Sequence, residues 1–444
     1  REAKLGLIGW VIADPEHAEA ASGLDGVRCC VLGGGADDRE LPDTVIDMER
    51  IDPAEVDAPA WYKPNPHRAG DIAFVLFTGE GASTKAIQIS NKRWALSALG
   101  TASAAALRSA DTVYSTTPFH HSSALLMSVG GAVAGGARFA MATADDPETF
   151  WDEVRRYGAT HVSYTWTSLR GITYASEDPN ERYNPIRMFI GSGMPRNLWT
   201  RVAERFPSAR VLEFYASAEG EAILANLTGQ RPGSMGRPLP GTAEVRVAAL
   251  NLAERRLELT SDGLARECLV DEVGLMLTRM PPADTGGGPI LRSVFANDDA
   301  WRSTGDLFLR DDQGDHWLAG SVSEIVDTAR GPVLPAGTRF CLGTIPAVDL
   351  LVAYGVKDGE DRVVVGAVTL RDGTALSTAD LDSAMNRLPR RHRPRYVQVV
   401  PTIALTTWSR PIWRNLQKRG VPKPARGRTV WRIDDETGHY RELT

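Results

Sequence analysis

The chain has 444 residues, enough for two or three domains. Its 50 lysine and arginine residues stand against 56 aspartate and glutamate residues, and the formal net charge of −6 argues against a general nucleic-acid-binding protein. The four cysteines, at positions 29, 30, 268 and 341, lack the spacing of a metal site. They indicate free thiols in a reducing compartment. No signal peptide is visible, and we expect a cytoplasmic protein, with association with a membrane as the alternative.

The first 70 residues predict one β-α-β unit and a connecting segment. Residues 10–14 and 27–32 are expected to form short buried strands, with a helix near residues 16–22 between them. This order is typical of a parallel sheet. Residues 37–70 are rich in Asp, Pro and Ala without clear periodicity, and we expect them to form a connecting surface segment.

Residues 71–85, DIAFVLFTGEGASTK, predict a strand over residues 72–77 followed by a loop of small residues. Thr78 opens the loop and Lys85 closes it. Such loops present backbone N–H groups to phosphates without a bulky side chain in the way. Glu80 would repel a triphosphate unless it points away or binds magnesium. A phosphate-binding loop and an ordinary strand-to-helix turn both remain open.

The next segments alternate between helix and strand. We expect a helix over residues 94–110 and a strand over residues 112–118, followed by the sequence Pro-Phe-His-His with His121 as its last residue. Residues 124–142 contain four glycines and an arginine, which favours a buried helix and a strand over a membrane span. An amphipathic helix over residues 147–157 precedes a strand over residues 160–165.

Two turns of small residues follow predicted strands. A strand over residues 186–190 leads into Gly191-Ser192-Gly193, and a helix over residues 198–206 precedes a second strand. That strand belongs to residues 212–220, LEFYASAEG, where a flat ligand can lie against bare backbone near Ala216. Glu219 closes this turn and either holds a magnesium ion or caps the next helix.

Residues 231–317 predict a region rich in strands. We expect strands over residues 243–247, 256–259 and 272–279, and an exposed glycine-rich loop over residues 283–289. Composition alone makes residues 231–241, RPGSMGRPLPG, a linker candidate. Asp306 lies in WRSTGDLF, where its carboxylate either accepts two O–H bonds from a diol or belongs to a turn before a strand.

The C-terminal residues predict a second, smaller folded region. Residues 350–356 and 362–370 alternate like paired strands, and a helix over residues 377–387 has Ser377 as its N-cap. Residues 387–395 contain five arginines and a histidine. We expect this basic patch to face the other domain, with the phosphates of coenzyme A or an anionic membrane surface as the alternatives.

Taken together, the segments at residues 71–85, 191–193, 212–220, 231–241 and 301–308 resemble the adenylate-forming superfamily. The branch they resemble is that of the fatty acid transport proteins and very-long-chain acyl-CoA synthetases. The resemblance implies an α/β large domain, with parallel-rich sheets, flanking helices and a β-rich region, over residues 1–317. It further implies a degenerate hinge at residues 318–322 and a small α+β domain over residues 323–444. We therefore expect residues 231–241 to connect two β regions of one domain.

The resemblance also implies the ligands and the role of each site residue. The ligands are ATP or AMP, Mg²⁺, coenzyme A and a long-chain fatty acid. His121 would lie beside the reacting carboxylate, and Glu219 would hold the magnesium ion. The remaining assignments are Thr78 and Lys85 to phosphate, Gly191, Ser192, Gly193, Tyr215 and Ala216 to adenine, Asp306 to the ribose hydroxyls, and Arg410 to the position of the family's catalytic lysine.

Several positions depart from the family pattern. Ala218 replaces a threonine, Gly320 and Ser321 replace the hinge aspartate and arginine, and Arg410 replaces the lysine. Removing one well-placed donor from a transition state costs roughly 10²–10³ in rate. Arginine keeps the charge, but a planar guanidinium is no substitute for a compact ammonium group. We therefore expect slow or absent adenylation.

Two functions of different classes follow from these observations. The first is a synthetase that joins a fatty acid to AMP and passes the acyl group to coenzyme A. The second is a non-catalytic module that binds an acyl chain or nucleotide, or holds other lipid enzymes together in a larger polypeptide. The family carries a further segment before the position of Arg1, so we expect the chain to be a fragment or one domain of a longer protein.

Overall fold

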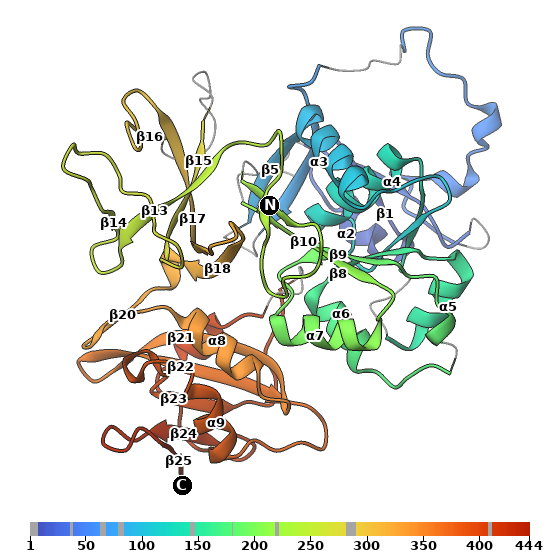
Figure 1. Cartoon of the computed structure of the whole chain (residues 1–444). Helices are drawn as coiled ribbons and strands as arrows, with labels where there is room; N and C mark the ends of the chain where they lie inside the picture. Colours follow the sequence, from blue (N-terminus) through green and yellow to red (C-terminus); the bar gives the residue numbers. More distant parts are fainter. Residues whose placement is uncertain are drawn as a thin grey trace. The chain divides into compact units, whose positions relative to one another are not determined.

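The computed structural model describes residues 8–35, 39–62, 68–78, 84–142, 147–179, 181–217, 222–280, 290–406 and 411–444, with the side chain of Thr78 excepted. The chain forms two compact units (Figure 1). Residues 1–103 and 118–136 make the first unit, and residues 104–117 and 137–444 make the second. All four cysteines are free and buried, in agreement with the sequence analysis.

The first unit begins with a small parallel sheet. Its strands β1 (Trp10–Ala13), β2 (Arg28–Val31) and β3 (Val45–Asp47) pair in that order, and helix α2 (Ala18–Ser22) connects the first two. The predicted β-α-β unit is therefore confirmed. The prediction for residues 37–70 was wrong at β3, because a strand of three residues is too short to show an alternating pattern.

The second part of the first unit is a hairpin with helices. Strands β4 (Ile72–Thr78) and β5 (Lys85–Ser90) are antiparallel, and the chain then forms α3 (Asn91–Ala104). A π-helical turn, η5 (Ala124–Val129), continues into α4 (Gly130–Gly135). The strand-to-helix interpretation of the loop after β4 was wrong, because a second strand follows it. Leu76, Ile89 and Leu126 form the buried cluster of this part.

A seven-stranded sheet organises the second unit (Figure 1). The strands, in spatial order, are β12 (Arg237–Pro238), β11 (Ile223–Asn226), β10 (Arg210–Ala216), β9 (Met188–Ser192), β8 (His161–Thr165), β6 (Thr112–Ser115) and β7 (Arg138–Met141). Neighbours from β7 to β10 pair in parallel, and β11 and β12 are antiparallel additions. Because residues 231–241 contribute an edge strand, they are not a linker, as predicted.

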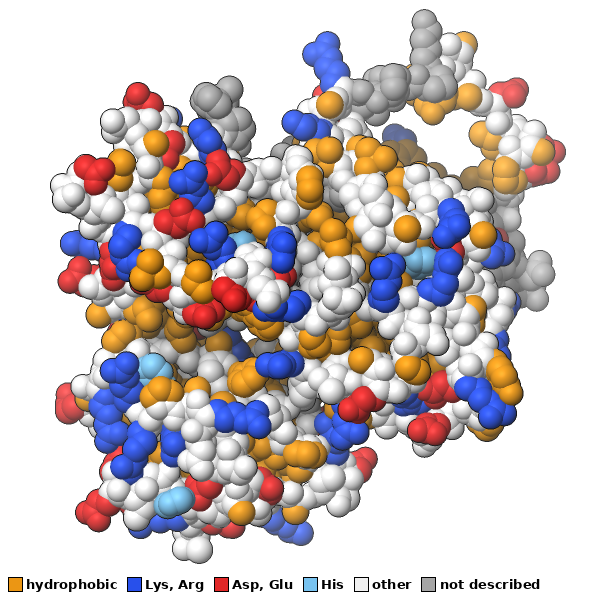
Figure 2. Space-filling view, viewed as in Figure 1, with side chains coloured by type: hydrophobic (Ala, Val, Ile, Leu, Met, Phe, Trp, Pro, Cys, Tyr) orange, Lys and Arg blue, Asp and Glu red, His pale blue; other side chains and the backbone are white. Residues whose placement is uncertain are grey.

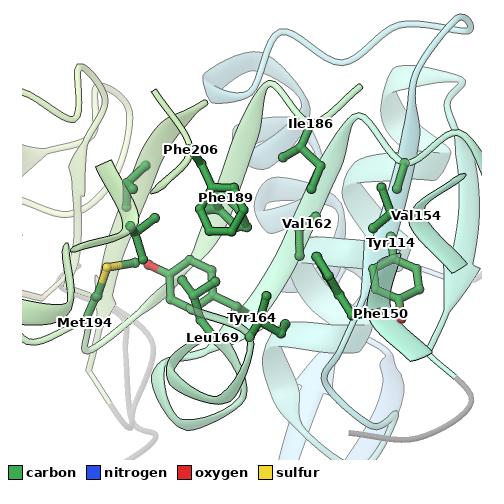
Figure 3. Packing of buried hydrophobic residues seen from close by; sticks show 14 of the residues in the cluster. Tyr114, Phe150, Val154, Val162, Tyr164, Leu169, Ile186, Phe189, Met194 and Phe206 are labelled. Atoms are coloured by element: carbon green, nitrogen blue, oxygen red, sulfur yellow. The ribbon is translucent and has the colours of Figure 1, made fainter. Parts of the chain in front are cut away.

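Helices α5 (Pro147–Tyr157), α6 (Trp166–Tyr174) and α7 (Arg196–Arg205) cover this sheet. The predicted helix over residues 147–157 is confirmed residue for residue. Its Phe150, Trp151 and Val154 are at most 5% exposed and belong to one buried cluster with Val162 and Phe189 of the sheet. Figure 3 shows Phe150 and Val154 in this cluster. Spacing of apolar residues at i, i+1 and i+4 thus identified the buried face of the helix.

Arg205, the last residue of α7, contacts the C-terminal turn of α6 and the chain that follows it. Its guanidinium donates hydrogen bonds to the carbonyl oxygens of Ile172, Thr173 and Ala175 at 2.7–2.8 Å. It also pairs with both carboxylate oxygens of Glu181, at 2.6 and 2.8 Å. The side chains of Arg205 and Glu181 are each 11% exposed, so this ion pair is largely withdrawn from water.

A six-stranded sheet forms the β-rich region of the second unit. Strands β14 (Arg256–Leu257), β13 (Val245–Asn251), β15 (Gly274–Arg279), β17 (Ala300–Arg310) and β16 (Ile290–Arg292) pair in that order, and β18 (His316–Ser321) pairs with β17. The three predicted strands are confirmed. The predicted glycine-rich loop at residues 283–289 lies outside the described residues. Residues 318–321, which belong to the predicted hinge, are the last four residues of strand β18. The division into domains at this point stays a prediction.

An ion pair on this region provides a test of pH dependence. Arg266 donates to both oxygens of Glu272, at 2.6 and 2.7 Å, and this contact lowers the pKa of Glu272 to about 2. A depressed pKa stabilises the fold above the unfolded value of about 4.3, and the stabilisation is lost as the pH falls through 2. Replacing Arg266 with methionine should therefore cost about 1–2 kcal/mol at pH 7, once solvent screening is allowed for.

Urea unfolding of the parent and of Arg266→Met between pH 7 and pH 2 measures this effect. The difference in unfolding free energy should shrink as the pH falls through the range from 4.3 to 2. Arg256→Met, at an exposed position of β14, is the control and should match the parent at each pH. A difference that stays constant with pH would contradict the assignment.

The C-terminal residues form a small mixed sheet with helices (Figure 1). Strands β21 (Val348–Asp358), β22 (Asp361–Leu370), β23 (Tyr396–Val399), β24 (Val430–Ile433) and β25 (Tyr440–Leu443) pair in sequence order. A two-stranded ladder of β19 (Val326–Thr328) and β20 (Gly331–Val333) precedes them, and the helices are α8 (Pro335–Gly343), α9 (Thr378–Met385) and α10 (Arg414–Lys418). The β21–β22 pairing and the Ser377 cap of α9 confirm the predictions.

Candidate functional site

The carboxyl ends of β9 and β10 bring the predicted adenine-contacting residues to one edge of the seven-stranded sheet. The two strands are parallel, and Gly191 of β9 is the register partner of Glu213 of β10. Ligands of open α/β sheets bind outside the carboxyl ends of the strands. Gly191 and Ser192 are the last residues of β9 rather than turn residues, and Gly193 leaves the strand with a φ of +78°. Ala216 ends β10 and is exposed.

Gly191 is flanked on both sides by large side chains of the neighbouring strands. It pairs in register with Tyr164 of β8 and Glu213 of β10, so the three residues form one row across the sheet. A Cβ atom on Gly191 would lie 2.7 Å from Cε2 and Cζ of the Tyr164 ring. The Tyr164 hydroxyl donates a 2.6 Å hydrogen bond to Oε2 of Glu213. Glycine is therefore needed here because the tyrosine ring occupies the space.

Glu213 is a buried acid next to the Gly193–Met194 backbone. Its side chain is fully buried, and its Oε1 accepts a 2.9 Å hydrogen bond from the backbone N–H of Met194. Burial raises the pKa of Glu213 to about 8, although the hydrogen bonds from Tyr164 and from the Met194 and Gly193 N–H groups act in the opposite direction. Burial thus favours the protonated form of this acid over the charged carboxylate. Sequence analysis missed Glu213, and its one signal is a carboxylate within an apolar strand.

Tyr215 and Asp306 meet although they are far apart in the sequence. The Tyr215 hydroxyl donates a 2.7 Å hydrogen bond to Oδ2 of Asp306. The Tyr215 ring packs edge-on against Phe308, with the ring centroids 4.8 Å apart, and is 8% exposed. Asp306 lies within β17, opposite Ser321 of β18, so the interpretation of Asp306 as a turn residue before a strand was wrong.

Three of the predicted residues belong to the first unit. Thr78 and Lys85 are register partners where the β4–β5 hairpin opens into its loop, and Lys85 is exposed. His121 lies in a turn before η5, and its Nδ1 accepts a 3.1 Å hydrogen bond from the Ser123 N–H and lies 2.6 Å from the Ser123 hydroxyl oxygen. His121 is only 9% exposed, so it is largely withdrawn from solvent.

Other predictions fall outside the described residues. These include the predicted magnesium ligand Glu219, the adjacent Ala218, and Arg410. Across the part of the chain that the structure describes, no group of three or more His, Cys, Asp or Glu residues is arranged to hold a metal ion. Within the same residues, none of the helices has the length and apolar character needed to cross a bilayer.

The predicted basic patch, residues 387–395, contributes four arginines to a pocket on the C-terminal sheet. Figure 2 shows Lys and Arg side chains gathered on the part of the molecule that carries β21 to β25. Arg395 donates to both oxygens of Asp435 at 2.6 Å, and Arg390 donates to the carbonyl oxygen of Glu436 at 2.8 Å. The arginines that line the pocket are Arg330, Arg390, Arg391, Arg393 and Arg395. Several of them thus hold the β24–β25 turn as well as line the pocket.

Comparison with known proteins finds a family model described as AMP-binding enzyme over residues 13–255. The chain is 29% identical over 401 residues to a medium/long-chain-fatty-acid–CoA ligase of Mycobacterium tuberculosis, covering 84% of this chain and 64% of that protein. It is 24% identical over 422 residues to long-chain fatty acid transport protein 2 of Rattus norvegicus, covering 90% and 67%. The chain thus spans about two thirds of the length of these two relatives.

Solved structures share the fold. A benzoate CoA ligase from Burkholderia xenovorans LB400 superposes with a TM-score of 0.73 at 19% identity, covering 94% of this chain and 81% of that one. ATP-bound MatB from Rhodopseudomonas palustris superposes with a TM-score of 0.72 at 18% identity, covering 94% and 80%. At these identities the likeness concerns the fold alone.

Proposed function

The chain belongs to the AMP-binding enzyme family, and we therefore propose that it carries the adenylating part of a fatty acyl-CoA synthetase. Its substrates would be a long or very long chain fatty acid, ATP and coenzyme A. The observation that carries the proposal is the meeting of the Tyr215–Asp306 pair with the small residues at the ends of β9 and β10. The two relatives described above act on, or are named for, long-chain fatty acids.

The residues at this edge fit a purine nucleoside. Ser192 and Gly193 are exposed, while Gly191 and Met194 on either side of them are buried, so a narrow strip of backbone faces outward. A flat base can approach such a strip closely. Asp306 has two carboxylate oxygens for the two ribose hydroxyls. One of these oxygens, Oδ2, already accepts a hydrogen bond from the Tyr215 hydroxyl.

The proposed reaction has two steps. A carboxylate oxygen of the fatty acid attacks the α-phosphorus of ATP, a new oxygen–phosphorus bond forms, and pyrophosphate leaves. The thiol of coenzyme A then attacks the acyl carbon, and AMP leaves with the electron pair of the broken carbon–oxygen bond. In this scheme Thr78 and Lys85 bind phosphate, His121 lies beside the fatty acid carboxylate, Arg410 neutralises developing charge, and Glu219 holds the magnesium ion.

The arginine-lined pocket supports a site for the phosphates of coenzyme A. Five arginines line it against three acidic residues, Asp361, Asp434 and Asp435. Guanidinium groups pair with phosphate through two parallel hydrogen bonds. Contact with an anionic membrane surface is the weaker alternative for the same residues, since the pocket gathers these groups around one concave site.

A non-catalytic module is the second candidate. The observation that favours it is the neighbour of Asp306 on β18: the register partner is Ser321, at the position where the family carries an arginine. A nucleotide would then lack one cation close to the predicted ribose contact. Such a module would retain ligand binding without turnover, within a larger lipid-metabolising polypeptide.

ATP–pyrophosphate exchange with a set of long-chain fatty acids separates the two candidates. We expect exchange that depends on a fatty acid and falls to background in Asp306→Ala, because that change removes the predicted acceptor of both ribose hydroxyls. ATP binding by calorimetry without exchange would favour the non-catalytic module. Neither exchange nor ATP binding would refute both nucleotide-dependent functions.

A further inference from the structure

We propose that Tyr164 and Glu213 are positioning residues for the nucleotide: together they fix the Gly193–Met194 backbone against which the purine would lie. The inference rests on the proposed function for the location of the purine. It goes beyond that function because neither residue belongs to the predicted set of ligand contacts. Both side chains are buried below the surface that Ser192 and Gly193 expose, and they are at most 2% exposed.

Three residues in one row across three strands bring Tyr164 and Glu213 together. Tyr164 on β8 and Glu213 on β10 are separated by β9, where Gly191 has no side chain. The tyrosine ring crosses above Gly191 and reaches the acid at 2.6 Å. Figure 3 shows Tyr164 among the core side chains, with its ring turned toward Met194. The hydrogen bond therefore spans the strand that leads directly into the turn.

Both carboxyl oxygens of Glu213 accept a hydrogen bond. Oε2 of Glu213 accepts from the tyrosine, and Oε1 accepts from the Met194 N–H at 2.9 Å. The fixed side chain thus holds a backbone group one residue after Gly193, whose φ of +78° turns the chain outward. Removing either partner would leave a buried polar group unsatisfied, which typically costs 1–3 kcal/mol.

A glutamine has the same shape as Glu213 and can keep both contacts. The amide oxygen of the glutamine would accept from the Met194 N–H, and its NH2 group would donate to the hydroxyl oxygen of Tyr164, so the tyrosine contact is kept with its direction reversed. A leucine of similar size can do neither. The two substitutions therefore separate the hydrogen bonds from the volume of the side chain.

The chain also provides a matched control pair. The Tyr114 hydroxyl donates a 2.6 Å hydrogen bond to Oε2 of Glu153, and Tyr114 lies on β6 of the same sheet. Both residues of this pair are buried, at 1% and 8% exposure. Neither is adjacent in sequence to a residue predicted to contact nucleotide. Tyr114→Phe removes one buried tyrosine hydroxyl from an acid, as Tyr164→Phe does.

The experiment measures the Kd for ATP by calorimetry and the separate KM values for ATP and fatty acid in pyrophosphate exchange. We expect Tyr164→Phe and Glu213→Leu to raise the Kd and KM for ATP about tenfold, with the KM for fatty acid unchanged. Glu213→Gln should stay within about threefold of the parent. Tyr114→Phe should lower the melting temperature without changing the Kd for ATP. If Glu213→Leu fails to fold, Tyr164→Phe, which deletes a single oxygen atom, decides the question.

If the parent chain binds ATP and Tyr164→Phe binds it equally strongly, the positioning role is overturned and the proposed function stands. An equal loss of ATP affinity in Tyr114→Phe would also overturn it, because the effect would then be one of general stability. A parent chain that binds no ATP would refute the proposed function and this inference with it.

Discussion

Replacing Arg410 with lysine should raise the rate of adenylation about 10²–10³-fold over the parent chain. The transition state of adenylation carries charge on a five-coordinate phosphorus, and one well-placed donor at such a centre contributes about 2.7–4 kcal/mol. A lysine ammonium group is compact and has three donors that can rotate, whereas a guanidinium group is planar and broad. Measurement of kcat for ATP–pyrophosphate exchange, with the fatty acid that gives the highest parent rate, tests this expectation.

Arg414→Lys is the matched control, because Arg414 is an exposed arginine at the start of α10, four residues further along the chain. It should leave the exchange rate unchanged. An Arg410→Lys variant that binds ATP but exchanges no faster than the parent would show that the loss lies elsewhere. The substitutions at Gly320 and Ser321, or a chain that has become a non-catalytic module, would then be the better explanation.

Replacing Arg205 with methionine should destabilise the second unit by about 3–5 kcal/mol, the usual cost of breaking a buried ion pair from one side. Methionine fills much of the volume of the arginine stem, but Glu181 and the carbonyl oxygens of Ile172, Thr173 and Ala175 lose their donors. Chemical denaturation followed by tryptophan fluorescence measures the change, since Trp151 and Trp199 are buried in the core that contains α7.

Arg155→Met is the control for this stability effect. Arg155 also pairs with two carboxylates, Asp152 and Asp178, but its side chain is 38% exposed. Ion pairs of this kind contribute about 0–1 kcal/mol. A loss below about 1 kcal/mol in Arg205→Met, or equal losses in the two variants, would contradict the importance assigned to the buried network.

The sequence predicts those elements whose pattern is local. Helix α5 shows a clear apolar stripe, β21 and β22 are long segments rich in Val, Leu and Ala, and Ser377 precedes α9 with Asp380 three residues later. Strand β3 has three residues, and β5 follows a loop that composition cannot tell from a strand-to-helix turn. Where the pattern is short, pairing with a neighbouring strand decides the structure, and the pairing is not visible in the local sequence.

The candidate site was predicted only in part, because it too depends on contacts between segments that are distant in the sequence. Asp306 and Tyr215 were each identified from family motifs, but their hydrogen bond depends on how two sheets come together, 91 residues apart in the sequence. Tyr164 and Glu213 were missed because each has the appearance of an ordinary strand residue until the row through Gly191 is known. The roles of His121, Lys85 and the other assigned residues remain predictions.

The hairpin formed by β4 and β5 has a consequence for how a triphosphate would be held. Many phosphate loops lead into a helix, whose N-terminus contributes a fixed partial positive charge that is only weakly screened. Here a strand follows the loop in place of a helix, so in the proposed role of this loop the exposed Lys85 would carry more of the attraction. Mobile ions shield an exposed charge within about 8 Å at physiological ionic strength. In the proposed role of this loop, capture of a triphosphate would therefore depend on the salt concentration of the surrounding solution.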